Sequence, residues 1–245
     1  MTNRFVRLEM IAGSEAVEIM SHCRIAVFGI GGVGGYAVEA LVRSGLGEID
    51  RIDHDTVDIT NINRQIIALD STVGQPKVDV FAARLKDINP DITVHTYQRF
   101  YLPEDKDWFD FKAYDYIIDA IDTVTAKIDL IIEAQKAGVP VISSMGTGNR
   151  LDPSKVYVTD LYQTSGDPLA RIMRHELKKR GVEKLTVCTS SEPPLKPAEK
   201  EIAAAETAAS NRRSVPGSSP FVPPAAGLAI AAYVFRELTG RKRSE

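Results

Sequence analysis

A glycine-rich turn between a strand pattern and a helix pattern constrains the fold of this chain more than any other feature. Residues 23–30 (CRIAVFGI) form a short apolar run, and residues 35–46 (GYAVEALVRSGL) have helical spacing. The turn that joins them has the sequence GIGGVGG and contains the spacing G-x-G-x-x-G. Glycine permits a tight turn and lets phosphates approach backbone N–H groups at the helix start. The candidate phosphate-contacting residues are Gly29, Gly31, Gly32 and Gly34.

Strand and helix patterns continue to alternate up to about residue 150. Further strands are predicted at residues 48–55, 92–100, 114–122 and 139–146, and further helices at 77–90 and 126–138. Repeated βαβ units indicate an α/β fold with a doubly wound, mostly parallel sheet of the Rossmann type. Ligands of such sheets bind at the carboxyl ends of the strands.

The pattern loosens beyond Leu151. Residues 168–181 predict a charged helix and residues 225–240 an apolar helix that ends in glycine. The stretch between them is rich in Pro, Ser, Ala and charge, so we expect a mobile loop near residues 193–215. We interpret the chain as a single domain, 1–245, with a nucleotide-binding core at 1–150 and a substrate-binding extension at 151–245.

Composition excludes several classes of protein. No segment approaches the roughly 20 apolar residues of a membrane span, and the first residues lack the apolar stretch of a signal peptide, so a cytoplasmic location is expected. The two cysteines, Cys23 and Cys188, cannot form a four-cysteine zinc site. The four histidines, His22, His54, His95 and His175, are scattered along the chain. Their spacing predicts no metal-binding triad.

Charge is distributed unevenly along the chain. The net formal charge is -3, with 30 Lys and Arg against 33 Asp and Glu. Residues 1–165 hold 16 of these basic residues and 24 of the acidic ones, which leaves 14 and 9 for residues 166–245. The last third is therefore basic and the rest acidic, which is consistent either with a polyanionic partner or with a solvated basic face.

An acidic residue follows the second predicted strand, with polar and cationic residues directly behind it. Asp53 lies 19 residues after Gly34, where a carboxylate binds the ribose of NAD or of ATP. A hydride-transfer site does not require cationic side chains at this position. A site for attack on phosphorus does, because negative charge builds on the phosphate oxygens. The cations are Arg64 and Lys77, and Asn61 and Gln65 offer neutral hydrogen bonds.

Two acids end a later predicted strand, in the sequence DAID. We expect Asp122 to hold Mg²⁺, and Asp119 either to share the metal or to cap the loop backbone.

The motifs GIGGVGG, IDHDTVDITNINRQ, VGQPKVDV and YIIDAIDTV, in this order, resemble the ThiF/MoeB/HesA superfamily of ubiquitin-activating-enzyme-like adenylyltransferases over about residues 1–150. The resemblance implies that ATP binds at the glycine turn and that a substrate carboxylate attacks its α-phosphate, which gives an acyl-adenylate and pyrophosphate. It implies nucleotide contacts from Asp53, Asp55, Asn61, Arg64, Gln65, Lys77 and Asp122. It also implies a homodimer in which Arg7 reaches the partner's site, so that the catalytic residues are Arg7, Arg64, Lys77 and Asp122.

The second half of the chain narrows the resemblance to one branch. Two cysteines exclude the paired CxxC zinc ligands that are typical of members activating ubiquitin-like sulfur carriers, which favours a smaller substrate. The series DP…VTDL…T…DPLA resembles the tRNA threonylcarbamoyladenosine dehydratase branch. That branch implies adenylation of the carboxylate and ring closure by the neighbouring urea, with tRNA as partner. The candidate tRNA-binding residues are Arg171, Arg174, Lys178, Lys179 and Arg180.

Two alternatives remain open from the sequence. The first is an adenylyltransferase that activates the C-terminus of a ubiquitin-like or sulfur-carrier protein, with Cys188 as acceptor of sulfur or of the carbonyl. A cysteine desulfurase or sulfur-acceptor system is a further candidate partner of the chain. The second is an NAD-dependent oxidoreductase, because the glycine turn and Asp53 suit either nucleotide.

Overall fold

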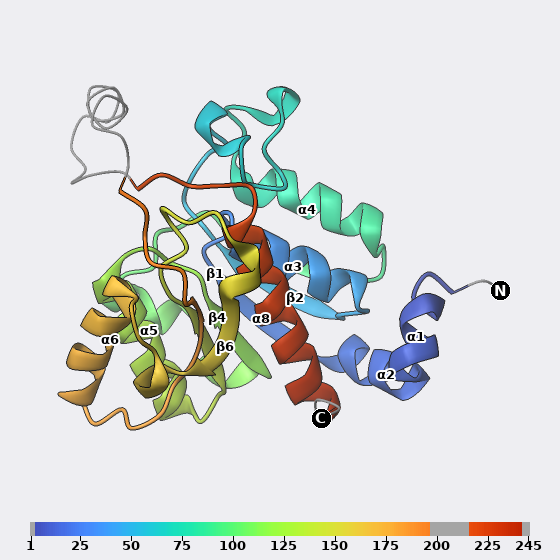
Figure 1. The fold of residues 1–245 in the computed structure, drawn as a ribbon. Coiled ribbons are helices and arrows are strands. Elements are labelled where there is room, and N and C mark those ends of the chain that lie inside the picture. The colour runs from blue at the N-terminus through green and yellow to red at the C-terminus, as the bar shows by residue number, and fades with distance from the viewer. Residues whose placement is uncertain (1–2, 197–215, 242–245) are drawn as a thin grey trace.

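The computed structural model describes residues 3–196 and 216–241, which form one seven-stranded sheet with helices on both faces (Figure 1). The strand order is β3-β2-β1-β4-β5-β7-β6, and every neighbouring pair is parallel except β6 with β7. The strands are β1 (Arg24–Phe28), β2 (Glu48–Ile52), β3 (Thr93–Tyr97), β4 (Tyr116–Asp119), β5 (Val141–Ser144), β6 (Val156–Asp160) and β7 (Thr186–Ser190). The doubly wound, mostly parallel sheet is the one that the sequence predicts.

Alternation along β1 separates the two cores of the molecule. Ile25 and Val27 face one core, whereas Ala26 and Phe28 face the other, because successive side chains of a strand point to opposite faces. The helices on the first side are α3 (Gly34–Arg43), α4 (Lys77–Ile88) and α8 (Val222–Thr239). Those on the second side are α5 (Val124–Ala137) and α6 (Pro168–Lys178).

The extension beyond residue 151 completes this sheet. Strand β7 pairs with β5, and β6 then pairs antiparallel with β7, although the sequence predicted neither strand. Helix α8 packs along α3 across the first core. The expected loop near 193–215 falls mostly on residues 197–215, which lie outside the described residues.

Two helices precede the sheet and were not predicted. They are α1 (Val6–Ala12) and α2 (Ser14–His22). Both lie at the amino ends of the strands, since Arg4 Nη1 donates to the carbonyl of Ile88 at 2.8 Å and Gly47 N donates to that of Met20 at 3.0 Å. Figure 1 shows them at the edge of the molecule remote from α6.

Short 3-10 helices fill the connections. They are Ile59–Asn61, Asp70–Thr72, Pro103–Trp108, Phe111–Ala113, Pro153–Lys155 and Leu161–Gln163. Among the described residues, no helix combines the length and apolar character needed to cross a membrane.

The contact between α3 and α8 depends on a glycine. A Cβ at Gly227 would lie 2.3 Å from the carbonyl oxygen of Val33 and 2.8 Å from Cβ of Tyr36. Gly227→Ala gains about 1 kcal/mol of helix propensity, but separating the two backbones costs about 1–3 kcal/mol. We therefore expect lower stability in urea unfolding. The neighbouring exposed Leu228→Ala should stay within about 0.5 kcal/mol of the wild type, and a Gly227→Ala protein as stable as the wild type would contradict this packing.

Candidate functional site

The glycine turn at the carboxyl end of β1 is built by close backbone approaches. Gly29 has φ +85°, and a Cβ there would lie 2.6 Å from the carbonyl oxygen of Ala120. A Cβ on Gly34 would lie 1.9 Å from the carbonyl oxygen of Gly29. At Gly31 the nearest atom would be Nε2 of Gln65, 3.8 Å away. Two of the glycines are thus required by the turn itself, and Gly31 leaves room for a ligand to approach the backbone.

The Asp53 carboxylate fixes the glycine turn through hydrogen bonds. Its Oδ2 accepts a hydrogen bond from Ile30 N at 2.9 Å, and its Oδ1 accepts one from Asp55 N at 2.9 Å. The side chain is buried, yet a carboxylate has about four acceptor positions, so both oxygens keep capacity for ribose hydroxyls.

Lys77 lies beside Asp53 at the start of α4. Its Nζ is 2.7 Å from Oδ2 of Asp55 and 3.9 Å from Oδ1 of Asp53, and its backbone N donates to the carbonyl of Asp55. The side chain is only 3% exposed. The structure therefore brings Asp53, Asp55 and Lys77 together and holds the ammonium group in one position.

The sequence behind Asp53 folds over the glycine turn. A Cβ on Gly32 would lie 3.3 Å from Cγ of Arg64, whose guanidinium donates to the carbonyl of Thr60. Burial lowers the pKa of Arg64 from its usual value. Gln65 is buried, and its Oε1 has no hydrogen-bond partner among the described residues. Such an orphaned acceptor is costly unless a ligand or water supplies a donor.

Asn61 has a local structural role as well. Its Oδ1 accepts from Asp58 N at 3.2 Å, while Asp58 caps the same short helix through Thr60 N. The amide oxygen of Asn61 is therefore engaged, and its NH₂ group is the part suited to a phosphate.

Asp122 lies on the loop between β4 and α5, next to the glycine turn. It is exposed and accepts only a long hydrogen bond, at 3.4 Å, from Thr123 Oγ1 among the described residues. Mg²⁺ is commonly bound by one or two carboxylates together with substrate phosphates, which suits this free carboxylate. Asp119 is buried and accepts from Ile121 N at 3.2 Å, so it caps the loop, the second of its two expected roles.

A buried ion pair supports the Asp122 loop, and sequence analysis missed it. Lys127 Nζ lies 2.9 Å from Oδ2 of Asp119 with both side chains fully buried, and it also donates to the carbonyl of Ile121. Ser143 Oγ donates to the same Asp119 oxygen at 2.5 Å. The available signal was a lysine in register with Leu130 and Ala134, on the apolar face of a predicted helix.

A second buried pair joins the carboxyl ends of β5 and β7 to the start of α6. Asp167 accepts hydrogen bonds from Gly146 N, from Thr189 Oγ1 and from two N–H groups of the first turn of α6. Arg150 Nη2 lies 3.6 Å from Oδ2 of Asp167 and has no hydrogen-bond partner among the described residues. The Asp-Pro sequence before a helix pattern could have identified this N-cap.

Arg7 does not join the site within one protomer. It is exposed on α1, at the amino ends of the strands, whereas the glycine turn, Asp53 and Asp122 follow carboxyl ends. Its helix borders a groove of about 490 Å³ that is lined by Glu9, Glu48 and Asn89 among others. This groove is at the wrong edge of the sheet for the nucleotide.

The five basic residues predicted for tRNA differ in their surroundings. Arg174 Nη1 donates to the carbonyl of Thr164 at 2.8 Å, so it anchors α6. Arg180 and Lys179 both pair with Glu176, at 2.7 and 3.3 Å, and hold its pKa below the usual value. Among the described residues, only Arg171 and Lys178 of this set are exposed without an ion-pair partner.

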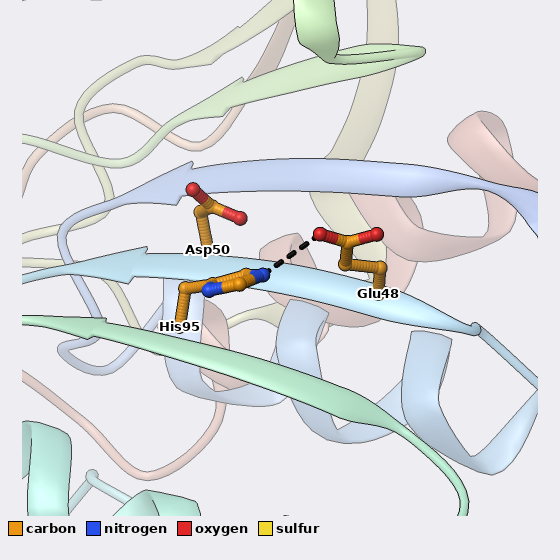
Figure 2. A group of neighbouring side chains, drawn as sticks. All are labelled: Glu48, Asp50 and His95. Carbon is orange, nitrogen blue, oxygen red and sulfur yellow. Dashed lines mark hydrogen bonds and ion pairs between the residues drawn. The ribbon is translucent and has the colours of Figure 1, made fainter. Parts of the chain in front are cut away.

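A histidine and two carboxylates meet on the face of β2 and β3 (Figure 2). Nε2 of His95 is 2.7 Å from Oε1 of Glu48, and Asp50 is the Cα partner of His95 in the parallel register. Arg24 donates to both oxygens of Asp50, at 3.0 and 2.9 Å, and Tyr114 donates to one. We interpret this group as a structural ion-pair network, which only the strand register could reveal.

Both cysteines are buried. Burial raises the pKa of Cys188 to about 12, and burial together with Asp115 raises that of Cys23 to about 11. A thiolate is the reactive form, so neither side chain is suited to nucleophilic attack at neutral pH.

Comparisons with known proteins place these motifs in a family. The model of the ThiF family matches residues 2–244. The chain belongs to the ThiF family. A tRNA threonylcarbamoyladenosine dehydratase of Bacillus subtilis is 43% identical over 242 residues, which cover 97% of this chain and 95% of the relative. The Escherichia coli dehydratase is 41% identical over 175 residues, which cover 71% of this chain and 65% of that protein.

Solved structures of the family agree with the fold. Escherichia coli tRNA N6-threonylcarbamoyladenosine dehydratase in complex with ATP has a TM-score of 0.86 at 33% identity, covering 97% of this chain and 94% of that one. The same protein in complex with AMP has a TM-score of 0.87. The resemblance drawn from the motifs and the predicted fold class are both confirmed.

The buried pair under the Asp122 loop generates a stability prediction. Lys127→Met leaves the Asp119 carboxylate buried without its cation and should lower stability by about 3–5 kcal/mol in urea unfolding. The double variant Lys127→Met/Asp119→Asn removes both charges and should recover part of that loss. As a matched control, Lys136→Met breaks an exposed pair with Glu133 and should cost less than about 1 kcal/mol. If Lys127→Met and Lys136→Met lower the free energy of unfolding equally, the buried pair does not support the loop.

Proposed function

We propose that the chain is an ATP-dependent tRNA threonylcarbamoyladenosine dehydratase. The observation that carries the proposal is the set of side chains at one edge of the sheet: Asp53 and Lys77 beside the glycine turn, Arg64 over it and Asp122 on the adjoining loop. The buried, protonated thiols favour a reaction that needs no cysteine. The relatives over nearly the whole chain bear the same name.

The chemistry follows from this arrangement. One oxygen of the substrate carboxylate attacks the α-phosphorus of ATP, the bond to the β-phosphate breaks, and pyrophosphate leaves. The urea of threonylcarbamoyladenosine then attacks the acyl carbon, loses a proton and expels AMP, which closes a ring. The substrate has formally lost water, and its carboxylate oxygen leaves with AMP. The nucleophile of the second step lies within the substrate, so proximity supplies much of the acceleration.

Each residue has a defined part in the proposed site. Asp53 binds the ribose hydroxyls, and Lys77 and Arg64 stabilise the charge that develops on the phosphates. Asn61 and Gln65 donate neutral hydrogen bonds through their amide NH₂ groups. This orientation of the Gln65 amide would also direct its Oε1 toward a ribose or water donor. Asp122 would hold Mg²⁺, which, when bound, neutralises phosphate charge and assists departure of pyrophosphate.

A homodimer would complete the site. Arg7 cannot reach the glycine turn of its own protomer, because the two lie at opposite edges of the sheet. The same helix exposes Met10 (72%) and Ile11 (83%), and an apolar pair this exposed suits a second copy of the chain. Arg7 would then act in the partner's site.

Helix α6 is the proposed contact with tRNA. Arg171 and Lys178 are exposed and are not neutralised by a described carboxylate, so they are the members of the basic set best able to bind phosphates. The cytoplasmic location fits this substrate and remains a prediction.

The alternative functions have weaker support. A sulfur relay through Cys188, with a cysteine desulfurase or sulfur-acceptor partner, conflicts with full burial of that thiol. Hydride transfer conflicts with membership of an adenylyltransferase-like family and gives no role to Arg64, Lys77 and Asp122.

Mass spectrometry of nucleosides tests the proposed reaction directly. Purified tRNA that contains threonylcarbamoyladenosine is incubated with the enzyme, ATP and Mg²⁺, digested gently and examined for a loss of water from that nucleoside. We expect the loss to require ATP and to be abolished by Asp122→Ala, with the fold of the variant intact by circular dichroism. If the wild type dehydrates no nucleoside, the proposed function is refuted.

The composite site predicts complementation between inactive variants. Arg7→Ala and Asp122→Ala should each be inactive alone, but after subunit exchange a heterodimer has one site with both residues intact. Mixing should therefore restore up to about a quarter of wild-type turnover, since random exchange makes half of the dimers mixed and each has one good site of two. No recovery after exchange shown by native mass spectrometry would remove Arg7 from the partner's site.

The role of α6 is tested by salt dependence. Arg171→Gln/Lys178→Gln should weaken tRNA binding and reduce the log–log salt slope by about 0.9 for each lost duplex phosphate contact. ATP affinity should not change. Arg236→Gln, on α8 at the opposite face, is the control for loss of charge. A slope that matches the wild type would mean that α6 is a solvated face and that tRNA binds elsewhere.

A further inference from the structure

The only tryptophan of the chain, Trp108, lies exposed near the candidate site. It ends the 3-10 helix Pro103–Trp108, and 59% of its surface is accessible. The Arg99 guanidinium lies over its ring, with Cζ 3.4 Å from the ring centroid. The next residue, Phe109, is buried and packs edge-on against Phe28 of β1. A buried aromatic anchor therefore holds an exposed stack of an indole ring and a guanidinium group.

This stack is tied to the backbone next to the proposed ribose-binding acid. The carbonyl of Tyr97, at the end of β3, accepts hydrogen bonds from both Asp53 N (3.2 Å) and Arg99 N (2.9 Å). His54, which follows Asp53, packs edge-on against Phe100 with ring centroids 4.7 Å apart. The Arg99–Trp108 stack thus lies at the same carboxyl edge as the nucleotide site, on its outer side.

The stack also lies on the same face of the sheet as α6. Tyr101 donates to Asp129 of α5 at 2.8 Å, which fixes the segment to that helix. Helix α6 packs against α5 as well. A single long ligand that contacts Arg171 on α6 could therefore extend across α5 to Trp108.

The charges near Trp108 decide which part of such a ligand fits. Its own short helix carries Glu104, Asp105 and Asp107 against one basic residue, Lys106, so its net charge is negative and would repel phosphates. The uncharged face of a base does not suffer this repulsion, and unpaired RNA bases commonly stack on aromatic rings and on guanidinium planes. The stack is exposed, so it suits a base presented from outside.

We infer that Arg99 and Trp108 form a stacking site for an unpaired nucleobase of the RNA substrate, separate from the phosphate contacts of α6. The inference rests on the proposed function, because it requires RNA to reach this edge of the sheet. In this arrangement the stack contributes affinity for the RNA and positions the target nucleoside, while the residues at the glycine turn carry out the reaction.

The intrinsic fluorescence of Trp108 tests the inference, because no other tryptophan contributes to it. The wild-type protein is titrated with tRNA that contains threonylcarbamoyladenosine and, separately, with ATP. Base stacking should quench the emission with tRNA, while saturating ATP alone leaves it unchanged. Quenching by ATP to the same extent would overturn the inference, since the stack would then take the adenine of ATP. Absence of quenching by tRNA would also overturn it.

Variants supply the second measurement. Trp108→Ala should weaken tRNA binding by roughly 5- to 150-fold, the range for loss of one stacked base, and should raise KM for tRNA more than it lowers kcat. Unlike Arg171→Gln/Lys178→Gln, it should leave the salt slope unchanged. Trp108→Phe should recover much of the affinity, and Leu228→Ala, exposed on the opposite face, should have no effect.

The stacking site and the proposed function can be refuted independently. If Trp108→Ala binds tRNA as tightly as the wild type and the wild type still dehydrates threonylcarbamoyladenosine, the stacking site is refuted and the proposed function stands. If the wild type binds and quenches with tRNA but dehydrates nothing, the proposed function is refuted and the stacking site stands as an RNA contact.

Discussion

The hydrogen bond between Ile30 N and the Asp53 carboxylate is the contact on which the candidate site depends. It joins the turn after β1 to the end of β2, and through Asp53 it places Lys77 at the same point. The turn can fold back on itself and approach the residues after β4 this closely only because Gly29 and Gly34 have no side chains. Charge, backbone donors and open space above Gly31 are therefore assembled before any nucleotide binds, so little ordering is left for binding to supply.

Buried ion pairs then fix the loops on either side of this turn. Asp119 and Lys127 hold the loop that carries Asp122, and Asp167 with Arg150 joins the ends of β5 and β7 to α6. Such pairs give limited net stability, but removing one partner is costly, so the loops have few alternative arrangements. Residues beyond 151 therefore continue the sheet of residues 1–150 through the pairing of β7 with β5, and they also cover it through α8.

The parts of this structure that repeat a local pattern could be predicted, and the parts that depend on tertiary contact could not. The glycine turn, Asp53 and the alternating strands and helices have short-range signals, and the sequence placed each of them correctly, although β2, β3 and β4 end three residues earlier than predicted. Strand β6 was missed because its residues are all half-buried and its antiparallel pairing depends on β7. Helices α1 and α2 are short, and their position depends on contacts with Ile88 and Gly47 far along the chain.

The site shows the same division. Arg64, Lys77 and Asp122 were predicted from motif spacing, whereas Lys127 and Arg150 were missed because their pairing with buried carboxylates arises only in the folded chain. The anchoring of Arg174 by Thr164 could not be inferred from a run of basic residues on one helix. Motifs indicate which residues are candidates for ligand contact, but the residues that hold them in place are identified only by the packing.

The central claim is that this edge of the sheet activates a carboxylate by adenylation. The most direct measurement uses tRNA whose threonylcarbamoyl carboxylate is labelled with ¹⁸O, with mass analysis of the nucleotide products after turnover. Attack on the α-phosphorus transfers one labelled oxygen to AMP and leaves pyrophosphate unlabelled, which is the result we expect. Label in inorganic phosphate would instead show attack on the γ-phosphorus, and unlabelled AMP after dehydration would contradict an acyl-adenylate.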